Sequence, residues 1–158
     1  MRKLVTWIKS AELASDAEVN LFEEAYGFRF SQEHRKFLIE QTNGGKSEEE
    51  IVVPTTDCPG GAGALHGLYG INHPQKIYDL GEAISALPGL LPSLVPFGFD
   101  QGSGEIFVDM STAVGRLVYI PIEELRDIPP RPYHVANSIA EFIEAGVALA
   151  KELNEEDD

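Results

Sequence analysis

The chain has 158 residues, a length at which one domain can bury a hydrophobic core without disulfides. Its 26 acidic and 12 basic residues give a net charge of −14, which argues against direct binding to DNA or RNA because the phosphate backbone requires clustered lysines and arginines. Its one cysteine, Cys58, excludes an internal disulfide and the multi-cysteine ligand sets of structural zinc sites.

The N-terminal part of the chain has the patterns of amphipathic helices. Ser15 and Glu18 have the spacing of a capping box, and apolar residues then recur at helical spacing until Gly27. A second helix is predicted after Ser31, and residues 3–13 are a candidate for a further helix. Polar residues interrupt the apolar run at the N-terminus, which fits neither a signal peptide nor a membrane span. We therefore expect a cytosolic protein that has no membrane partner.

Residues 42–50, TNGGKSEEE, contain Gly-Lys-Ser at 45–47, the end of a phosphate-binding loop pattern. The full pattern needs a glycine where this chain has Glu40, and it follows a strand, whereas this segment follows a predicted helix. We interpret the Asn-Gly-Gly sequence at 43–45 as the cap of that helix, because Gly and Asn commonly adopt the left-handed conformation just past a helix end. Three consecutive carboxylates follow the cap: Glu48, Glu49 and Glu50.

The middle and C-terminal parts predict a sheet and two more helices. Runs with the pattern of strands occupy residues 50–56, 65–71, 94–100, 105–110 and 116–122. Residues 79–87 predict a short helix, and Ser138 with Glu141 forms a second capping box that begins a terminal helix. Short connections favour antiparallel pairing. The predicted fold is one α+β domain, residues 1–153, in which helices pack against a mostly antiparallel sheet, followed by an acidic disordered tail, residues 154–158.

Two segments rich in glycine or proline are interpreted as connections. The segment DQGSGEIFVD, from Asp100, has glycines where a calcium loop needs oxygen ligands, and it continues as a strand where a dinucleotide loop would open a helix. We interpret it as a hairpin turn in which Gly102 and Gly104 supply positive φ. RDIPPRPYHV, from Arg126, is interpreted as a connector to the last helix, and the alternative is an extended exposed segment that binds a partner.

Histidine, cysteine and serine residues give little sign of a catalytic or metal site. His66 lies eight residues from Cys58 and seven from His73, so a metal site would require the glycine-rich loop to fold back on itself. The chain has no close-spaced ligand pair such as Cys-x-x-Cys, and its serines lack the Gly-x-Ser-x-Gly motif of hydrolases. A catalytic hypothesis would depend on Cys58 paired with a histidine. We predict no enzyme activity, no metal and no cofactor.

The order of these features resembles a known superfamily. Residues 17–45 contain a helix that ends at glycine, an aromatic-rich linker, a second helix and Asn-Gly-Gly. The strand LHGLYGI, the hairpin segment LVPFGFDQGSGEIFVDMS and the closing helix SIAEFIEAG follow. This order resembles the SUKH superfamily, which includes the fungal Smi/Knr cell-wall regulators and many bacterial relatives. The chain departs from the family at Phe30-Ser31, where Leu-Pro is common, at His34, where an aromatic residue is common, and at Gly104, where a polar residue is usual.

The resemblance implies a non-catalytic binding protein, because many bacterial members resemble immunity proteins that neutralise a toxin, often a nuclease. From Ser47 to Gly115 the chain has nine acidic residues and one basic residue, Lys76. An acidic surface would match the basic surface of a nuclease and would speed their encounter. The residues that we predict to bind such a partner are Glu48, Glu49, Glu50, Asp57 and Asp100.

Two alternatives remain open from the sequence. The three consecutive glutamates are also typical of an ordinary solvated loop. The fungal relatives suggest a regulatory scaffold that binds a cellular protein instead of a toxin.

Overall fold

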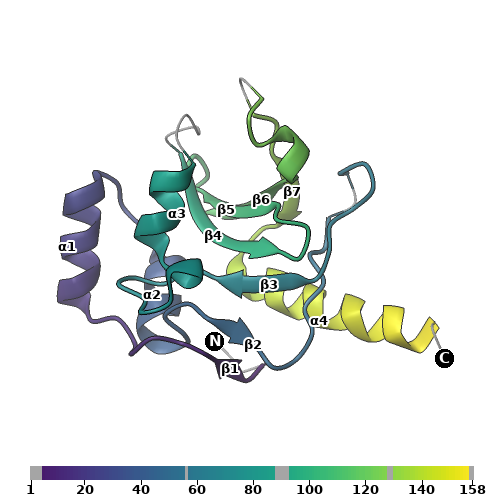
Figure 1. Ribbon diagram of the computed structural model, residues 1–158, viewed down its shortest axis with the longest axis horizontal. Helices are drawn as coiled ribbons and strands as arrows, with labels where there is room; N and C mark the ends of the chain where they lie inside the picture. Colours follow the sequence, from purple (N-terminus) through teal and green to yellow (C-terminus); the bar gives the residue numbers. More distant parts are fainter. Residues whose placement is uncertain (1–4, 56, 88–92, 128–129, 157–158) are drawn as a thin grey trace.

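The computed structural model describes residues 5–55, 57–87, 93–127 and 130–156. Its centre is a five-stranded antiparallel sheet in which each strand pairs with the next along the chain (Figure 1). The strands are β3 (Leu65–Leu68), β4 (Leu94–Asp100), β5 (Glu105–Asp109), β6 (Arg116–Ile120) and β7 (Tyr133–Ala136). Two shorter strands, β1 (Trp7–Ile8) and β2 (Lys46–Ser47), form a separate antiparallel ribbon. The predicted class, α+β with a mostly antiparallel sheet, is confirmed.

The helices lie around this sheet. They are α1 (Asp16–Tyr26), α2 (Gln32–Glu40), α3 (Leu80–Ala86) and α4 (Ile139–Glu156), with 3-10 turns η1 (Lys76–Tyr78) and η2 (Ile122–Glu124). Figure 1 shows α1, α2 and α3 together at one end of the molecule and the C-terminal end of α4 at the other.

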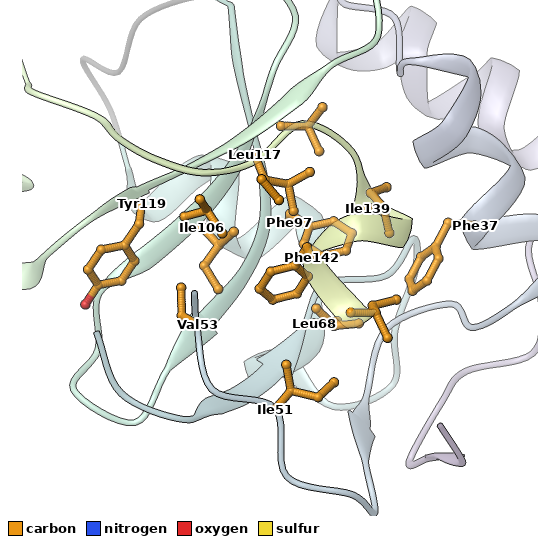
Figure 2. Packing of buried hydrophobic residues seen from close by; sticks show 14 of the residues in the cluster. Phe37, Ile51, Val53, Leu68, Phe97, Ile106, Leu117, Tyr119, Ile139 and Phe142 are labelled. Atoms are coloured by element: carbon orange, nitrogen blue, oxygen red, sulfur yellow. The ribbon is translucent and has the colours of Figure 1, made fainter. Parts of the chain in front are cut away.

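The main hydrophobic core lies between α4 and the sheet (Figure 2). Phe142 of α4 is fully buried, and its ring lies edge-on to that of Phe97 of β4, with 6.0 Å between the ring centroids. Because side chains alternate along a strand, Ile106 of β5 joins this core, whereas the next residue, Phe107, joins a smaller cluster with Val118. The segment after β2 supplies Ile51 and Val53 to the same core.

The predicted starts of α1 and α4 and the predicted end of α1 are confirmed. Ser15 accepts a hydrogen bond from the backbone N–H of Glu18, whose carboxylate accepts one from the backbone N–H of Ser15, so the capping box is confirmed. Gly27 ends α1 in the left-handed conformation, with φ of 73°. Ser138 accepts a hydrogen bond from the N–H of Glu141 at the start of α4. That helix continues to Glu156, into the segment predicted as a tail, and residues 157–158 lie outside the described ranges.

Three segments differ from the secondary structure predicted for them. Residues 5–13 contain the short strand β1 instead of a helix, because Trp7 and Ile8 pair with β2 and Ala11 pairs with Asn43. Residues 51–55 form no strand of the sheet, since the segment makes only an isolated bridge between Val52 and Ala64. The segment interpreted as a connector to the last helix contains β7, which pairs with β6 and forms one edge of the sheet.

The turn between β4 and β5 is a hairpin, as predicted, but its glycines have another role. The residue with positive φ is Ser103, at 66°, and neither Gly102 nor Gly104 has this conformation. A Cβ atom at Gly104 would collide with the Tyr119 hydroxyl. Position 104 therefore requires glycine because a side chain would not fit there, and not because the backbone has an unusual conformation. Among the described residues, no helix is long and apolar enough to cross a membrane.

Candidate functional site

The Asn-Gly-Gly sequence at 43–45 joins three backbone segments and does not cap α2. That helix ends at Glu40, and Gln41 after it is in the right-handed conformation. The Asn43 amide donates to the carbonyl oxygens of Glu12 and Ile71, both at 3.0 Å, and its Oδ1 accepts from the N–H of Ile71 at 2.7 Å. This side chain therefore ties the N-terminal segment to the end of β3.

The two glycines allow these backbones to approach closely. Both have positive φ, at 81° and 97°. A Cβ atom at Gly44 would lie 2.7 Å from the N atom of Gly70, and one at Gly45 would lie 2.5 Å from the carbonyl oxygen of Ile8. Because Lys46 and Ser47 then form β2, no phosphate-binding loop is present at this position.

Glu48, Glu49 and Glu50 follow β2 in the chain, and all three are exposed on the surface. The backbone N–H of Glu48 donates to the carbonyl of Thr6 at 2.9 Å. The N–H of Thr6 donates in turn to the Glu49 carboxylate at 2.7 Å, and Ser47 Oγ donates to the Glu49 carbonyl at 2.6 Å. The backbone of the carboxylate segment is thus held against the residues around β1.

The C-terminal half of α4 lies beside this segment. The N–H of Val52 donates to the carbonyl of Gly146 at 3.1 Å, and Asn154 Nδ2 donates to the Glu50 carboxylate at 3.4 Å. Gly146 permits this crossing, since a Cβ atom there would lie 2.5 Å from Ile51 Cγ2 and 2.9 Å from the Val52 carbonyl. The exposed Glu152 and Glu155 lie in the last turns of the same helix. We call Glu48, Glu49, Glu50, Glu152 and Glu155 the acidic ledge.

The carboxylates of α4 do not serve the stability of the helix. The C-terminal end of a helix dipole is negative and favours cations, yet the last turn of α4 contains no basic residue. Leu153, between the acidic positions, is 44% exposed and adds an apolar contact to the surface. Sequence patterns could not place α4 beside residues 48–50, because the contact joins positions about a hundred residues apart.

The other two predicted binding residues lie elsewhere. Asp57 is exposed in the loop that precedes β3, and the negative charges of Glu123 and Glu124 act on the adjacent Cys58, which places this loop near η2. Asp100 is 3% exposed, and its carboxylate accepts hydrogen bonds from the N–H groups of Gly63 and Gly104 and from the Tyr119 hydroxyl. Asp100 therefore holds the hairpin and the neighbouring loop together, and its carboxylate is not available on the surface.

A comparison with protein families identifies the relationship of the chain. The model of the SMI1 / KNR4 family (SUKH-1) matches residues 13–145. The chain belongs to this family. No curated protein matches the chain significantly. The SUKH-1 match begins before α1, includes the whole five-stranded sheet and ends within α4. It therefore contains Glu48, Glu49 and Glu50, whereas the two ledge residues of α4 lie beyond it.

Buried ionisable groups of this SUKH-1 domain were not predicted from its sequence. The Tyr69 hydroxyl donates to the Glu105 carboxylate at 2.7 Å on the sheet. Burial raises the pKa of Glu105 to about 7; the hydrogen bond from Tyr69 lowers it and the charge of Asp100 raises it. Burial also raises the pKa of Tyr69, and the charge of Glu105 adds to this effect. A single glutamate at the start of a strand gives no signal of such a pair in the sequence.

His34 is the second unexpected group. Its imidazole is fully buried at the start of α2, and neither ring nitrogen has a hydrogen-bond partner among the described residues. Its ring packs edge-on against Phe30 and Phe97, at centroid distances of 4.8 Å and 5.4 Å. Burial lowers the pKa of His34 to about 3, so the ring is neutral at ordinary pH. It occupies a position where SUKH relatives commonly have an aromatic residue, and it packs as one.

Cys58, which was considered for catalysis or metal binding, is buried, and both ring nitrogens of His73 lie against backbone groups. Burial raises the pKa of the Cys58 thiol, with a smaller contribution from Glu124, and a protonated thiol is a poor nucleophile. His73 Nε2 lies 2.8 Å from the carbonyl oxygen of Lys9, and its Nδ1 accepts from the N–H of Gln75. Within the described residues, no group of three or more His, Cys, Asp or Glu side chains is placed to hold a metal ion.

Proposed function

We propose that this SUKH-1 domain is a non-catalytic binding protein of the cytosol that captures a basic protein partner, as immunity proteins capture toxins. The observation that carries the proposal is the acidic ledge, where three consecutive exposed carboxylates lie beside the acidic end of α4. Of the nine acidic residues from 47 to 115, Asp100 and Asp109 are buried and Asp79 and Glu105 are half-buried. The exposed ones are therefore concentrated at residues 48–50.

The chemistry of the ledge suits a nuclease toxin. A nuclease needs a basic surface to hold nucleic-acid phosphates, and closely spaced carboxylates can occupy that surface by offering similar charge. The field of an acidic surface also raises the association rate with a basic partner. Leu153 in the same turns of α4 is an exposed apolar side chain, and its burial by a partner would add to the affinity.

A regulatory scaffold is the second candidate. The family match is compatible with both functions, since the SUKH-1 family is described by the SMI1 / KNR4 proteins. A scaffold would bind a cellular protein by a surface that need not be the ledge. The two functions therefore differ in how strongly they depend on the charges at residues 48–50.

The proposal is tested by a growth-rescue assay in cells that express any toxin-like domain encoded beside the gene for this protein. The wild type is compared with the double variant Glu48→Lys and Glu50→Lys. This variant keeps Glu49, whose carboxylate holds the Thr6 N–H. The matched control is Glu40→Lys with Glu82→Lys, which makes the same change in net charge at two exposed positions away from the ledge.

We expect the wild type and the control to restore growth and the ledge variant to lose rescue. Rescue that survives the ledge substitutions would contradict the role of the ledge. A folded wild-type protein that gives no rescue would contradict the immunity function and favour the scaffold.

A further inference from the structure

A second surface of opposite character lies between α1 and α2. A groove of about 930 Å³ follows the linker that joins the two helices, residues 27–31. Its floor contains Phe28 and Phe30, and its rim contains Arg29 and Lys36. A volume of this size is in the range of pockets that bury a ligand or a short peptide segment, roughly 300–1,000 Å³.

The floor of the groove is aromatic and rigidly supported. The rings of Phe28 and Phe30 meet edge-on at 4.9 Å, and both pack on Phe22 of α1 at 6.0 Å. Phe28 is only half-buried, so part of its ring faces the groove. The space at the end of α1 is open, since a Cβ atom at Gly27 would meet no atom within 4 Å. An apolar side chain of a ligand could therefore cover Phe28 without displacing a residue.

The charges inside the groove are already paired. Glu23 accepts hydrogen bonds from the N–H of Phe30 at 2.8 Å and from Arg35 at 3.3 Å. Arg35 also contacts the carboxylate of Asp16 at 3.0 Å and the side-chain oxygen of Asn20 at 2.9 Å. These contacts fix the walls of the groove and leave little charge on Arg35 or Glu23 for a ligand.

The rim, by contrast, has unpaired cations. Arg29 and Lys36 are exposed, and neither takes part in a hydrogen bond or ion pair with another described residue. Glu24 is the one exposed carboxylate among the lining residues. Three of the 12 basic residues of this acidic chain thus lie within residues 29–36. The net charge of −14 repels an acidic ligand at long range. The attraction must therefore come from short-range pairing of the ligand with the cations of the rim.

We propose that this groove binds an acidic peptide segment of a partner protein, with an aromatic or aliphatic side chain of the segment on Phe28 and its carboxylates on Arg29 and Lys36. Arginine suits this role because its planar guanidinium binds a carboxylate through two hydrogen bonds. The groove lies at the end of the molecule formed by α1 and α2, away from the free end of α4 (Figure 1). The inference goes beyond the proposed function and does not depend on it, because the two surfaces share no residue.

A displayed library of random linear peptides identifies the chemistry of the ligand that the groove selects. We expect one class of the selected peptides to contain an aromatic or aliphatic residue flanked by aspartates and glutamates. The best peptide is then labelled with a fluorophore and titrated against the full chain by fluorescence anisotropy. A second peptide, in which serine replaces the apolar residue, tests the contact with Phe28.

Charge reversal separates the groove from other surfaces. The double variant Arg29→Glu and Lys36→Glu is compared with Lys76→Glu and Lys151→Glu, which makes the same charge change at exposed positions on η1 and α4. We expect the groove variant to weaken binding by about tenfold or more, and the control and Glu48→Lys with Glu50→Lys to leave it within about twofold. The serine peptide is also expected to bind more weakly.

Three results would overturn the proposal. The first is a library in which no class of enriched peptides combines an apolar residue with acidic residues. The second is equal affinity of the groove variant and its control for the selected peptide. The third is equal affinity of the serine peptide and the parent peptide for the wild type.

Discussion

At the scale of single residues, two buried ionisable groups make opposite contributions to the pH dependence of stability. The pKa of His34 is lowered from 6.5 to about 3, and the pKa of Glu105 is raised from 4.5 to about 7, in both cases chiefly by burial. His34 binds a proton more readily in the unfolded chain, whereas Glu105 binds one more readily in the folded chain. Each pair of values defines a pH range in which one group changes the free energy of unfolding.

The substitution His34→Phe should stabilise the protein. Below pH 6.5 His34 is protonated in the unfolded chain, whereas in the folded chain it stays neutral down to about pH 3. The free energy of unfolding therefore falls as the pH falls through this range. Phenylalanine removes that loss and two unpaired buried nitrogens, which together should add about 1–3 kcal/mol to the free energy of unfolding at acidic pH. Urea unfolding at several pH values measures the effect. An unchanged slope of stability against pH in this variant would contradict the assignment.

The substitution Glu105→Gln should change the free energy of unfolding at neutral and alkaline pH. The stability that Glu105 contributes is present below pH 4.5 and is lost as the pH rises through about 7, because the buried carboxyl then ionises. Glutamine keeps an oxygen that can accept from the Tyr69 hydroxyl but never ionises, so we expect higher stability than the wild type above neutral pH. A carboxyl titration by NMR checks the pKa directly. The variant Tyr69→Phe should raise it further, since the hydrogen bond from Tyr69 lowers it.

At the scale of elements, the contact between α4 and residues 50–53 holds the ledge together. Ile51 and Val52 cross the helix at Gly146, where a Cβ atom would lie 2.5 Å from Ile51 Cγ2. In an ordinary exposed helix, changing glycine to alanine adds about 1 kcal/mol of stability. Here we expect Gly146→Ala to destabilise the protein by about 1–3 kcal/mol, because the core is overpacked and the Val52 hydrogen bond is strained.

The control for that prediction is Ala148→Gly at an exposed position of the same helix, which should cost about 1 kcal/mol through helix propensity alone. Denaturant midpoints of the two variants give the comparison. Stabilisation by Gly146→Ala would show that residues 50–53 are not held against α4.

Elements with strong local signals could be predicted from the sequence. The start and end of α1 follow from Ser15, Glu18 and Gly27, and β4, β5 and β6 follow from their apolar patterns. The N-terminal segment and β7 could not be predicted, because their strand pairing depends on distant partners. For β1 these are Lys46 and Ser47, about forty residues away.

The candidate site was predicted in part for the same reason. The carboxylates at 48–50 are visible in the sequence, and the structure places them on the surface. Asp100 is also a carboxylate, but it is buried, and two of its hydrogen bonds come from Gly63 and Tyr119, which are far from it in the chain. Sequence pattern therefore located the charge, and tertiary contacts decided which charges a partner can reach.

At the scale of the whole molecule, charge is distributed unevenly between two ends. The acidic ledge lies where residues 48–50 meet the C-terminal half of α4, and the cationic rim of the groove lies between α1 and α2. Figure 1 shows α1 and α2 at one end of the molecule and the C-terminal half of α4 extending toward the other. The two proposals together predict that the protein can bind two partners of opposite charge at once.

The central claim is that a basic partner binds at the acidic ledge, and hydrogen exchange of the complex with that partner tests it most directly. Amide protection reports which backbone segments a partner covers. The account predicts added protection at residues 46–50 and in the last turns of α4, with no change in α1 and α2. Protection confined to other segments, with residues 46–50 and α4 exchanging as in the free protein, would contradict it.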